Sequence, residues 1–423
     1  MHRDAESRGV LRRRRRHRPR AVWPLAIAGS VLVLTLNTSV AGASSSASHK
    51  YKKSSIISSL PTSLQSLYKG TPDHVHVSPE RKLAAKKTPY KLCFEDSYEG
   101  NAWRIAVREQ LQRLAKVAEK KGTVASFKYS VSNMSPTLEN SQLHAFIDEK
   151  CTAIMLDAGS ETGDNTAIAD AYKNGIPVIA FNNYVSSPDA EVVTQPFYVW
   201  GQTMAKDIAK RLHGKGTVIM LEGISGNGVA VQENEGAKAV WKKYPGLTIL
   251  TAHGNWTPST TSSAILQTLG THAGNITAVW STGSEAWYIA QAFQKAGRPI
   301  PYITSSTAGN TLALIKSNPA KYGKLFFGTA TVPVPVADYA FAVTIRTLEG
   351  QRPKVSPIMF PLTPFTGKRI KGWYGSCMTQ GSESPLPVPP KAPLTTQQLS
   401  AYFVNGKPIS FYSYHSTLPK VCS

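Results

Sequence analysis

From Tyr90 onward, the chain alternates between short apolar runs and longer segments in which apolar residues recur at helical spacing. Residues 91–94 are the first apolar run and predict a short buried strand. Between Asn101 and Lys121, apolar residues recur every three or four positions, which predicts an amphipathic helix. The alternation continues to about residue 348, so the pattern predicts parallel sheets covered by helices on both faces.

The remaining elements follow the same logic. We expect strands at 91–94, 123–131, 153–156, 176–181, 217–221, 247–251, 278–281 and 301–304. We expect helices at 101–121, 138–149, 166–174, 199–212, 229–243, 258–271, 285–296 and 336–348, with 312–317 and 325–328 completing the run. So many β–α units exceed one open sheet, which favours two similar lobes; an eight-fold barrel is the competing architecture. The extended, polar stretch 186–196 falls about halfway and indicates a crossing between lobes.

Both ends of the chain lack this alternation. Residues 44–89 are rich in Ser, Lys, Thr and Pro and predict a flexible tether, with a short apolar pattern around Leu60, Leu64 and Leu67. Residues 354–423 carry scattered prolines, a proline-rich run at 385–390 and a candidate helix at 395–403. We expect this C-terminal extension to be packed on the two lobes or strapped across them.

The N-terminus has the features of a targeting signal. Arginines occupy positions 12–16, an apolar stretch ends at Leu36, and Ala41-Gly-Ala43 supplies the small residues that a signal peptidase requires. We therefore expect a signal peptide over residues 1–43 and export to the periplasm or the outer face of the cytoplasmic membrane. The uncharged stretch is just long enough to span a bilayer, so an uncleaved membrane anchor is the alternative.

The net charge of +22 raises the question of nucleic-acid binding. Nine arginines stand within the first twenty residues, and more than half of the net charge precedes residue 91. Beyond that point Lys and Arg are scattered rather than gathered into one stripe, unlike the pattern of a nucleic-acid-binding face. We therefore expect a monomer with a solvated basic surface and no nucleic-acid partner.

Four cysteines occur, and an exported protein permits them to form two disulfides. Their spacing matches no zinc motif of paired cysteines. If the sheets are parallel, Cys93 and Cys151 lie near the starts of neighbouring strands. We therefore favour the pairs Cys93–Cys151 and Cys377–Cys422, with free buried thiols as the alternative.

Signatures of enzyme chemistry are missing from the sequence. It has no nucleophile elbow, no His-Glu-x-x-His, no phosphate loop and no dinucleotide fingerprint after the first strand. The ten histidines are dispersed, so we expect no metal, no cofactor and no catalytic residue. The segment 223–228 is glycine-rich and precedes a helix, where an anion can bind. It lacks the lysine of a nucleotide site, so we interpret it as a turn at the mouth of a lobe.

Polar and aromatic residues follow the predicted strands, at the sheet edge where open α/β folds bind ligands. Carboxylates and amides hydrogen-bond sugar hydroxyls, and flat aromatic rings stack on the apolar face of a pyranose. The candidate ligand-binding residues at these strand ends are Ser97, Tyr98, Asn101, Trp103, Asp157, Asn182, Asn183, Trp256, Glu285 and Ser306. Structural roles compete with several of these assignments. Trp103 can join its helix to the sheet, Asn182 and Asn183 can form a turn, and Glu285 can stabilise a helix start.

Several segments, in this order, resemble one family. They are Ser97-Tyr-Glu-Gly-Asn-Ala-Trp-Arg104, Gly175-Ile-Pro-Val-Ile-Ala-Phe181, Gly223-Ile-Ser-Gly226 with Asn234-Glu-Gly236, and Ala278-Val-Trp-Ser-Thr-Gly-Ser-Glu285 with Ala296-Gly297. Over residues 90–352 the chain resembles the ribose/galactose-type periplasmic binding proteins, the type I solute-binding proteins of sugar ABC importers.

The resemblance implies two Rossmann-like lobes joined by three hinge crossings, with a ligand held between them. The first lobe would comprise residues 90–195 with 331–353, and the second residues 196–330. A small polar ligand, preferably a monosaccharide, and the membrane permease of an ABC importer are the implied partners.

The resemblance also extends to single positions. Asn101 and Trp103 match the family's hydrogen-bonding Asn and stacking aromatic, and Trp256 matches a position that is commonly aromatic. Asn182 stands where the family usually has a ligand-binding Asp, and Asn183 where ribose binders carry Arg.

The chain departs from the family pattern elsewhere. The family's sugar-gripping Arg is replaced, with Glu233 as the nearest match, and its later Asn and Asp fall on Gly283 and Ser306. We therefore add Glu233 to the candidate residues and leave the ligand's identity open. A neutral sugar is favoured, and a cationic or amine-bearing ligand is the alternative because of Asp96, Asp157 and Glu233.

Other roles compete with transport. One is a ligand sensor that presents its closed state to a membrane receptor, and another is an exported carbohydrate-active enzyme with Asp96 and Asp157 as its carboxylate pair. A transcription regulator of the same fold is disfavoured by the signal segment and by the lack of a helix-turn-helix before Tyr90.

Overall fold

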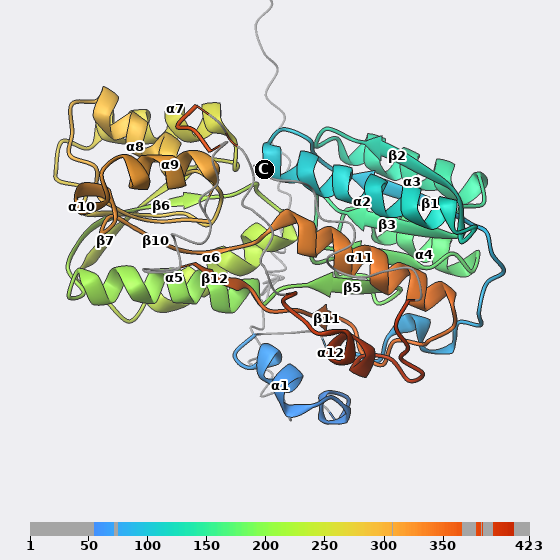
Figure 1. Cartoon of the computed structure of the whole chain (residues 1–423). Coiled ribbons are helices and arrows are strands. Elements are labelled where there is room, and N and C mark those ends of the chain that lie inside the picture. Colours follow the sequence, from blue (N-terminus) through green and yellow to red (C-terminus); the bar gives the residue numbers. More distant parts are fainter. Residues whose placement is uncertain are drawn as a thin grey trace, which may run out of the picture. The chain divides into compact units, whose positions relative to one another are not determined.

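The computed structural model describes residues 55–71, 75–306, 308–365, 378–381, 383 and 392–409. The predicted signal peptide, residues 1–43, and Cys377 and Cys422 lie outside these ranges. Two six-stranded sheets, each covered by helices, form two lobes, as the alternation of apolar patterns predicts (Figure 1). Within the described part of the chain, no helix is long and apolar enough to cross a membrane.

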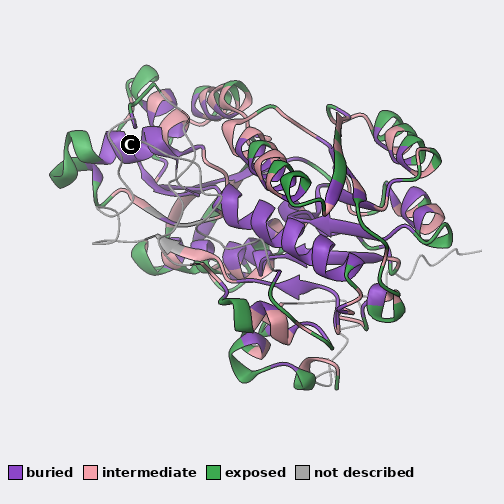
Figure 2. Ribbon diagram, turned by 45° about the vertical axis from the view of Figure 1, so that its right-hand side comes forward, coloured by how far each residue is buried: buried purple, intermediate pink, exposed green. Residues whose placement is uncertain are grey.

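The first lobe is built around a sheet in the order β11-β5-β4-β3-β1-β2, in which every pair is parallel. Its elements are β1 (Tyr90–Asp96), α2 (Ala102–Lys120), β2 (Val124–Val131), α3 (Pro136–Asp148), β3 (Ala153–Asp157), α4 (Asn165–Lys173), β4 (Val178–Phe181), β5 (Ala190–Thr194), α11 (Pro333–Leu348) and β11 (Ile358–Met359). Every residue of α11 is buried, so this helix lies within the first lobe's hydrophobic core rather than on its surface (Figure 2).

The second lobe has a sheet in the order β12-β10-β9-β8-β6-β7, parallel except for β12. Its elements are α5 (Phe197–Arg211), β6 (Gly216–Glu222), α6 (Gly228–Trp241), β7 (Leu247–His253), α7 (Pro258–Thr271), β8 (Ala278–Trp280), α8 (Ala286–Lys295), β9 (Tyr302–Thr304), α9 (Gly309–Ser317), α10 (Pro319–Tyr322), β10 (Phe326–Ala330) and β12 (Thr363–Phe365). Both sheets reverse their strand order beside the first strand, at β1/β3 and at β6/β8.

Three short segments cross between the lobes, at residues 195–196, 331–332 and 360–362. Two of them run side by side, because Gln195 donates a hydrogen bond from Nε2 to the carbonyl of Pro361 over 3.1 Å. The sequence predicts that the first crossing lies within 186–196. In the structure, residues 190–194 of that stretch form the buried strand β5, and the crossing follows them. Its acidic residue Glu191 conceals the strand from pattern analysis, since a buried carboxyl group interrupts the expected apolar run.

The ends of the described chain differ from the expected tether and extension. Leu60, Leu64 and Tyr68 are buried in the first-lobe core, and the Tyr68 hydroxyl donates to the carbonyl of Pro357 over 2.5 Å. Residues 55–71 and 75–89 are therefore docked rather than a flexible tether, because the apolar pattern around Leu64 has a partner surface. The docked elements are η1 (Ile57–Ser59), α1 (Thr62–Gln65), η2 (Ser66–Tyr68) and η3 (Pro79–Lys82).

The C-terminal extension is strapped across both lobes, one of the two arrangements expected. Strand β11 pairs with β5 in the first sheet, and β12 pairs with β10 in the second. The chain then returns to the first lobe, where α12 (Thr396–Ala401) begins at a capping box formed by Thr395 and Gln398.

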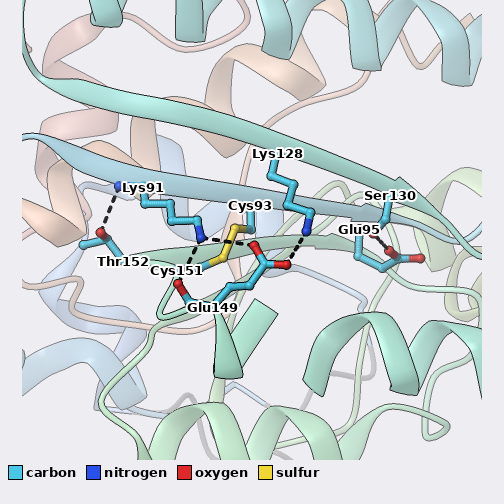
Figure 3. Close-up of a disulfide and its surroundings, with 8 residues drawn as sticks. All are labelled: Lys91, Cys93, Glu95, Lys128, Ser130, Glu149, Cys151 and Thr152. Carbon is cyan, nitrogen blue, oxygen red and sulfur yellow. Dashed lines mark hydrogen bonds and ion pairs between the residues drawn. A yellow bond between two sulfur atoms is a disulfide. The ribbon is translucent and has the colours of Figure 1, made fainter. Parts of the chain in front are cut away.

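The predicted disulfide between Cys93 and Cys151 is confirmed (Figure 3). Parallel pairing of β1 with β3 aligns Cys93 with Ile154, which brings the Cα atoms of the two cysteines to 6.0 Å. Beside it, the ammonium groups of Lys91 and Lys128 both bind the carboxylate of Glu149. The disulfide closes a separation of 58 residues, which stabilises the lobe by roughly 4 kcal/mol in the chain-entropy model.

Several buried carboxyl groups form no salt bridge with the described residues. Burial raises the pKa of Glu80 to about 7 and that of Glu95 to about 8, and it raises the pKa of Glu191 well above its ordinary value. Such a group holds its proton more tightly when the protein is folded. It therefore stabilises the fold below the unfolded pKa of about 4.5, and this contribution is lost as the pH rises through the folded pKa.

We expect the melting temperature to be highest at mildly acidic pH and to fall between about pH 5 and pH 9. Glu191→Gln, which keeps the shape and removes the ionisation, should flatten this dependence and raise the melting temperature at pH 8.5. Calorimetric melts across the pH series test this, with exposed Glu235→Gln as the control. A melting temperature that rises from pH 5 to pH 9 would contradict the assignment.

Candidate functional site

The two reversals of strand order open a crevice at the carboxyl ends of β1, β3, β6 and β8, which is where open parallel sheets bind ligands. A cleft between the lobes lies there and encloses about 880 Å³, counting its open mouth. Both lobes and the crossing segments contribute to it. Its lining residues are Asn101, Ala102, Trp103, Arg104, Asn182, Phe197, Trp200, Val229, Glu233, Trp256, Pro258, Thr282, Gly283, Ser284, Glu285, Tyr288, Ser306, Ala308, Thr331, Pro333 and Glu383.

The indole of Trp256 is held against two glycines in the wall of the second lobe. A Cβ atom on Gly223 would lie 2.3 Å from the Trp256 ring, and one on Gly283 would lie 2.4 Å from it. Gly223 follows β6 and Gly283 follows β8, so the ring covers the reversal point of the sheet. Trp256 itself adopts a positive φ of 52°, which a side chain larger than glycine rarely does. The ring is therefore a fixed aromatic surface in the cleft.

The start of α2 supplies the facing wall. Asn101 caps this helix, because its side-chain oxygen accepts from the backbone N–H of Arg104 at 3.0 Å. Its amide nitrogen donates across the cleft to the carbonyl of Trp256 at 3.4 Å. Trp103, on the first turn, donates from Nε1 to the carbonyl of Thr331 over 2.7 Å. The same helix turn thus touches the opposite lobe and one hinge crossing.

A buried ion cluster supports this wall from behind. Asp96 and Asp157 end neighbouring parallel strands in register, and the guanidinium of Arg104 lies 2.5 Å from one carboxylate and 2.7 Å from the other. Asp157 also accepts hydrogen bonds from Asn182 at 3.2 Å and Asn183 at 2.6 Å. Burial raises the pKa of Asp96 to about 7, and Arg104 opposes that rise. The cluster aims the Asn182 side chain, whose backbone has a positive φ of 59°.

Two further carboxyl groups lie in the wall of the second lobe, and neither is paired with a cation. Glu233 is buried and accepts a hydrogen bond from the hydroxyl of Thr282 at 2.5 Å. Burial raises its pKa well above the ordinary value. Burial also raises the pKa of Glu285 to about 7; its carboxylate accepts from Ser281 at 2.7 Å and from Thr261. These groups present hydrogen-bonding atoms with little charge.

Three lining residues carry buried polar atoms without a hydrogen-bond partner among the described residues. They are Trp200 Nε1, Trp256 Nε1 and the hydroxyl of Ser306. An unpaired buried donor or acceptor costs about 1–3 kcal/mol. The cleft wall therefore contains two donors and one hydroxyl that lack a partner within the described chain.

The lobes also touch each other at the turn that precedes α6. Asn227 donates from its amide to the carbonyl of Ala158 at 3.5 Å, and the N–H of Glu161 donates to the carbonyl of Gly226 at 3.2 Å. Gly228 approaches so closely that a Cβ atom there would lie 2.4 Å from the carbonyl oxygen of Tyr184. The conformation is therefore a closed one, in which the segment 223–228 is an inter-lobe turn.

The structure brings most of the sequence-derived candidates together. Asn101, Trp103, Asn182, Glu233, Trp256, Glu285 and Ser306 all line the cleft. Ser97, Tyr98, Asp157 and Asn183 do not, because strand register places Asp157 and Asn183 in the ion cluster behind the wall. Among the described residues, no group of three His, Cys, Asp or Glu is arranged to hold a metal ion.

Several residues that line the cleft were not predicted from the sequence. Thr282 lies two residues beyond β8, so its place near a strand end was a usable signal. Phe197, Trp200 and Tyr288 lie on helices, where an aromatic residue usually belongs to the core. Glu383 belongs to the C-terminal extension, and no local pattern indicates that this part of the chain returns to the cleft.

Comparisons with known proteins agree with this geometry. A family model described as "Periplasmic binding protein domain" matches residues 97–352. A xylitol-binding protein of Mycolicibacterium smegmatis is 24% identical over 234 residues, which cover 54% of this chain and 66% of that protein.

Solved structures show the same fold. An ABC transporter solute-binding protein from Thermobispora bispora superimposes with a TM-score of 0.66 at 24% identity, covering 76% of this chain and 98% of its own. The binding protein of the arabinose ABC transporter from Shewanella sp. ANA-3, bound to L-arabinofuranose, gives 0.58 at 18% identity over 66% of this chain and 93% of its own.

Removing Arg104 tests the ion cluster. Arg104→Met leaves two buried carboxylates unpaired and should lower the free energy of unfolding by about 3–5 kcal/mol. Arg108→Met removes a partly exposed ion pair with Glu99 and should cost at most about 1 kcal/mol. Urea unfolding without ligand measures both losses, and equal losses would contradict the cluster's role.

Gly223→Ala tests whether ligand affinity depends on the position of the Trp256 ring. The added methyl group occupies the space of the indole, so we expect the ring to move and ligand affinity to fall at least tenfold while the fold persists. Gly270→Ala, within α7 where a Cβ meets nothing within 4 Å, is the matched control and should leave affinity unchanged. Tryptophan fluorescence and calorimetric titration distinguish the two variants. An unaltered affinity in Gly223→Ala would show that the ring's position is unimportant.

Proposed function

The chain belongs to the periplasmic binding protein family, and from that premise we propose that it is the solute-binding protein of an ABC importer. Its ligand is a neutral sugar or polyol, held in the cleft between the lobes. The observation that carries the proposal is the combination of the Trp256 ring with a surround of amide, hydroxyl and carboxyl hydrogen-bonding groups.

The charges around the cleft support a neutral ligand. The guanidinium of Arg104 is bound to Asp96 and Asp157, so it has no net charge to offer an anion. Those carboxylates are equally unavailable to a cation, which removes the main reason for a cationic ligand. Asn101 and Asn182 can donate to a ligand oxygen through their amides, and Glu233, whose pKa burial raises, adds a carboxyl group to the lining. A polyol presents the matching set of hydroxyl groups.

Closure of the lobes provides the mechanism. The contacts of Asn101 with Trp256 and of Asn227 with Ala158 exist only when the lobes meet. A ligand that binds both walls has its highest affinity for this closed state and shifts the population toward it. The closed surface is then what the membrane permease recognises, outside the cytoplasmic membrane and after cleavage of the signal peptide.

Binding without turnover is part of the proposal. A glycosidase needs two free carboxyl groups on either side of a sugar bond. Asp96 and Asp157, the pair considered for that role, are bridged by Arg104 and lie behind the cleft wall. This arrangement supports a receptor rather than a carbohydrate-active enzyme.

A ligand screen tests the function. Xylitol and other pentitols, arabinose, ribose, galactose and myo-inositol are added to the purified protein, and a binder should raise the melting temperature and show micromolar affinity by calorimetry. Trp256→Ala should weaken binding at least tenfold, whereas Tyr172→Ala, an exposed aromatic residue outside the cleft lining, should not. Absence of any shift with folded protein would overturn the assignment.

A further inference from the structure

One carboxyl group of the cleft comes from outside both lobes. Glu383 belongs to the C-terminal extension, which pairs through β12 with the second sheet before it and packs on the first-lobe core after it. The later anchor includes Leu394, whose N–H donates to the hydroxyl of Tyr339 at 2.6 Å, and the buried Tyr402 and Phe403. The extension is thus held at both lobes, and Glu383 lies in the cleft lining between these anchors.

The carboxylate of Glu383 interacts with tyrosines of both lobes. Tyr288, on α8 of the second lobe, lines the cleft together with Glu383; burial raises the pKa of Tyr288, and its interaction with Glu383 adds to that rise. Tyr98 follows β1 in the first lobe; burial raises its pKa, and the charge of Glu383 adds to that rise. Glu383 is only partly buried, and Tyr288 lines the cleft beside it.

The charge at this position is not neutralised from within the cleft. Among the described lining residues, Arg104 is the one basic side chain, and it is committed to Asp96 and Asp157. The other two lining carboxyl groups, Glu233 and Glu285, are deeply buried, and burial raises the pKa of each. Glu383 differs from them because it is open to solvent and to a ligand.

We propose that Glu383 is a ligand-contacting residue that sets charge specificity: it accepts a hydrogen bond from a hydroxyl or ammonium group of the ligand and excludes ligands that carry a carboxylate or phosphate there. The proposal rests on the sugar- or polyol-binding function argued above. It assigns the extension a role in recognition that neither lobe carries out alone. Neutral polyols and amino sugars are therefore accepted, and uronic acids are rejected.

The test uses xylitol, galactose, galactosamine and galacturonate as probes in calorimetric titrations at pH 7. Wild-type protein should bind the neutral and amino probes at least tenfold more tightly than galacturonate. Glu383→Gln should reduce this discrimination about tenfold, because it removes the charge and keeps a hydrogen-bonding group. Glu383→Lys should reverse the preference toward galacturonate. Glu119→Gln, an exposed residue on α2, is the matched control, and melts without ligand verify folding.

The outcomes separate the two proposals. If wild-type protein binds a neutral or amino probe and its discrimination against galacturonate is unchanged in Glu383→Gln and Glu383→Lys, the role of Glu383 is overturned while the binding function stands. If galacturonate binds wild-type protein as tightly as galactose, charge exclusion is likewise overturned. If wild-type protein binds neither these four probes nor any sugar or polyol of the ligand screen above, the sugar-binding function fails, and the role of Glu383 fails with it.

Discussion

The arrangement of the cleft depends on one buried interaction, the bridging of Asp96 and Asp157 by Arg104. Parallel register brings the two carboxylates to the ends of adjacent strands, where burial disfavours their charged forms. The guanidinium offsets that penalty only because the first turn of α2 is placed by the Asn101 cap. Strand register, helix start and the orientation of Asn182 are thus set together, so the first-lobe wall is prepared before any ligand arrives.

The second lobe forms the opposite wall of the cleft around the indole of Trp256. Two glycines at the ends of β6 and β8 make room for the indole of Trp256, which a larger residue at either position would displace. Trp256 also accepts the hydrogen bond from Asn101, and Trp103 on the same helix turn binds the crossing at Thr331. The two tryptophans of the cleft therefore take part in the hydrogen bonds that hold the lobes closed: Trp256 in a contact between the lobes, and Trp103 in a contact with a crossing segment. This connection is what a receptor needs if occupancy is to change its shape.

Charge is managed in the cleft by burial and pairing. The basic side chain in the lining is held by two aspartates, and Glu233 and Glu285 have raised pKa values. What remains is a set of directional hydrogen-bonding groups around an aromatic ring, with the partly buried carboxylate of Glu383 beside them, which suits a polyhydroxylated solute. The strong positive charge of the whole chain plays no part in this, since most of it lies before the lobes begin.

Periodicity along the chain determined the alternating strands and helices, the two-lobe α/β architecture and the strand ends where ligand residues gather, because local apolar spacing reflects which face each element buries. The strand ends indicated six of the residues that line the cleft, and the family resemblance added Glu233; the parallel order of the strands indicated the pairing of Cys93 with Cys151. Strand β5 was not predicted, since Glu191 breaks its apolar pattern; burial in the folded interior raises the pKa of this carboxyl group. Only the tertiary structure decided that Asp157 supports the wall rather than lining it, and that residues 55–71 dock. The same holds for the arrival of Glu383 at the cleft, because these outcomes depend on contacts between segments far apart in sequence, which no local spacing encodes.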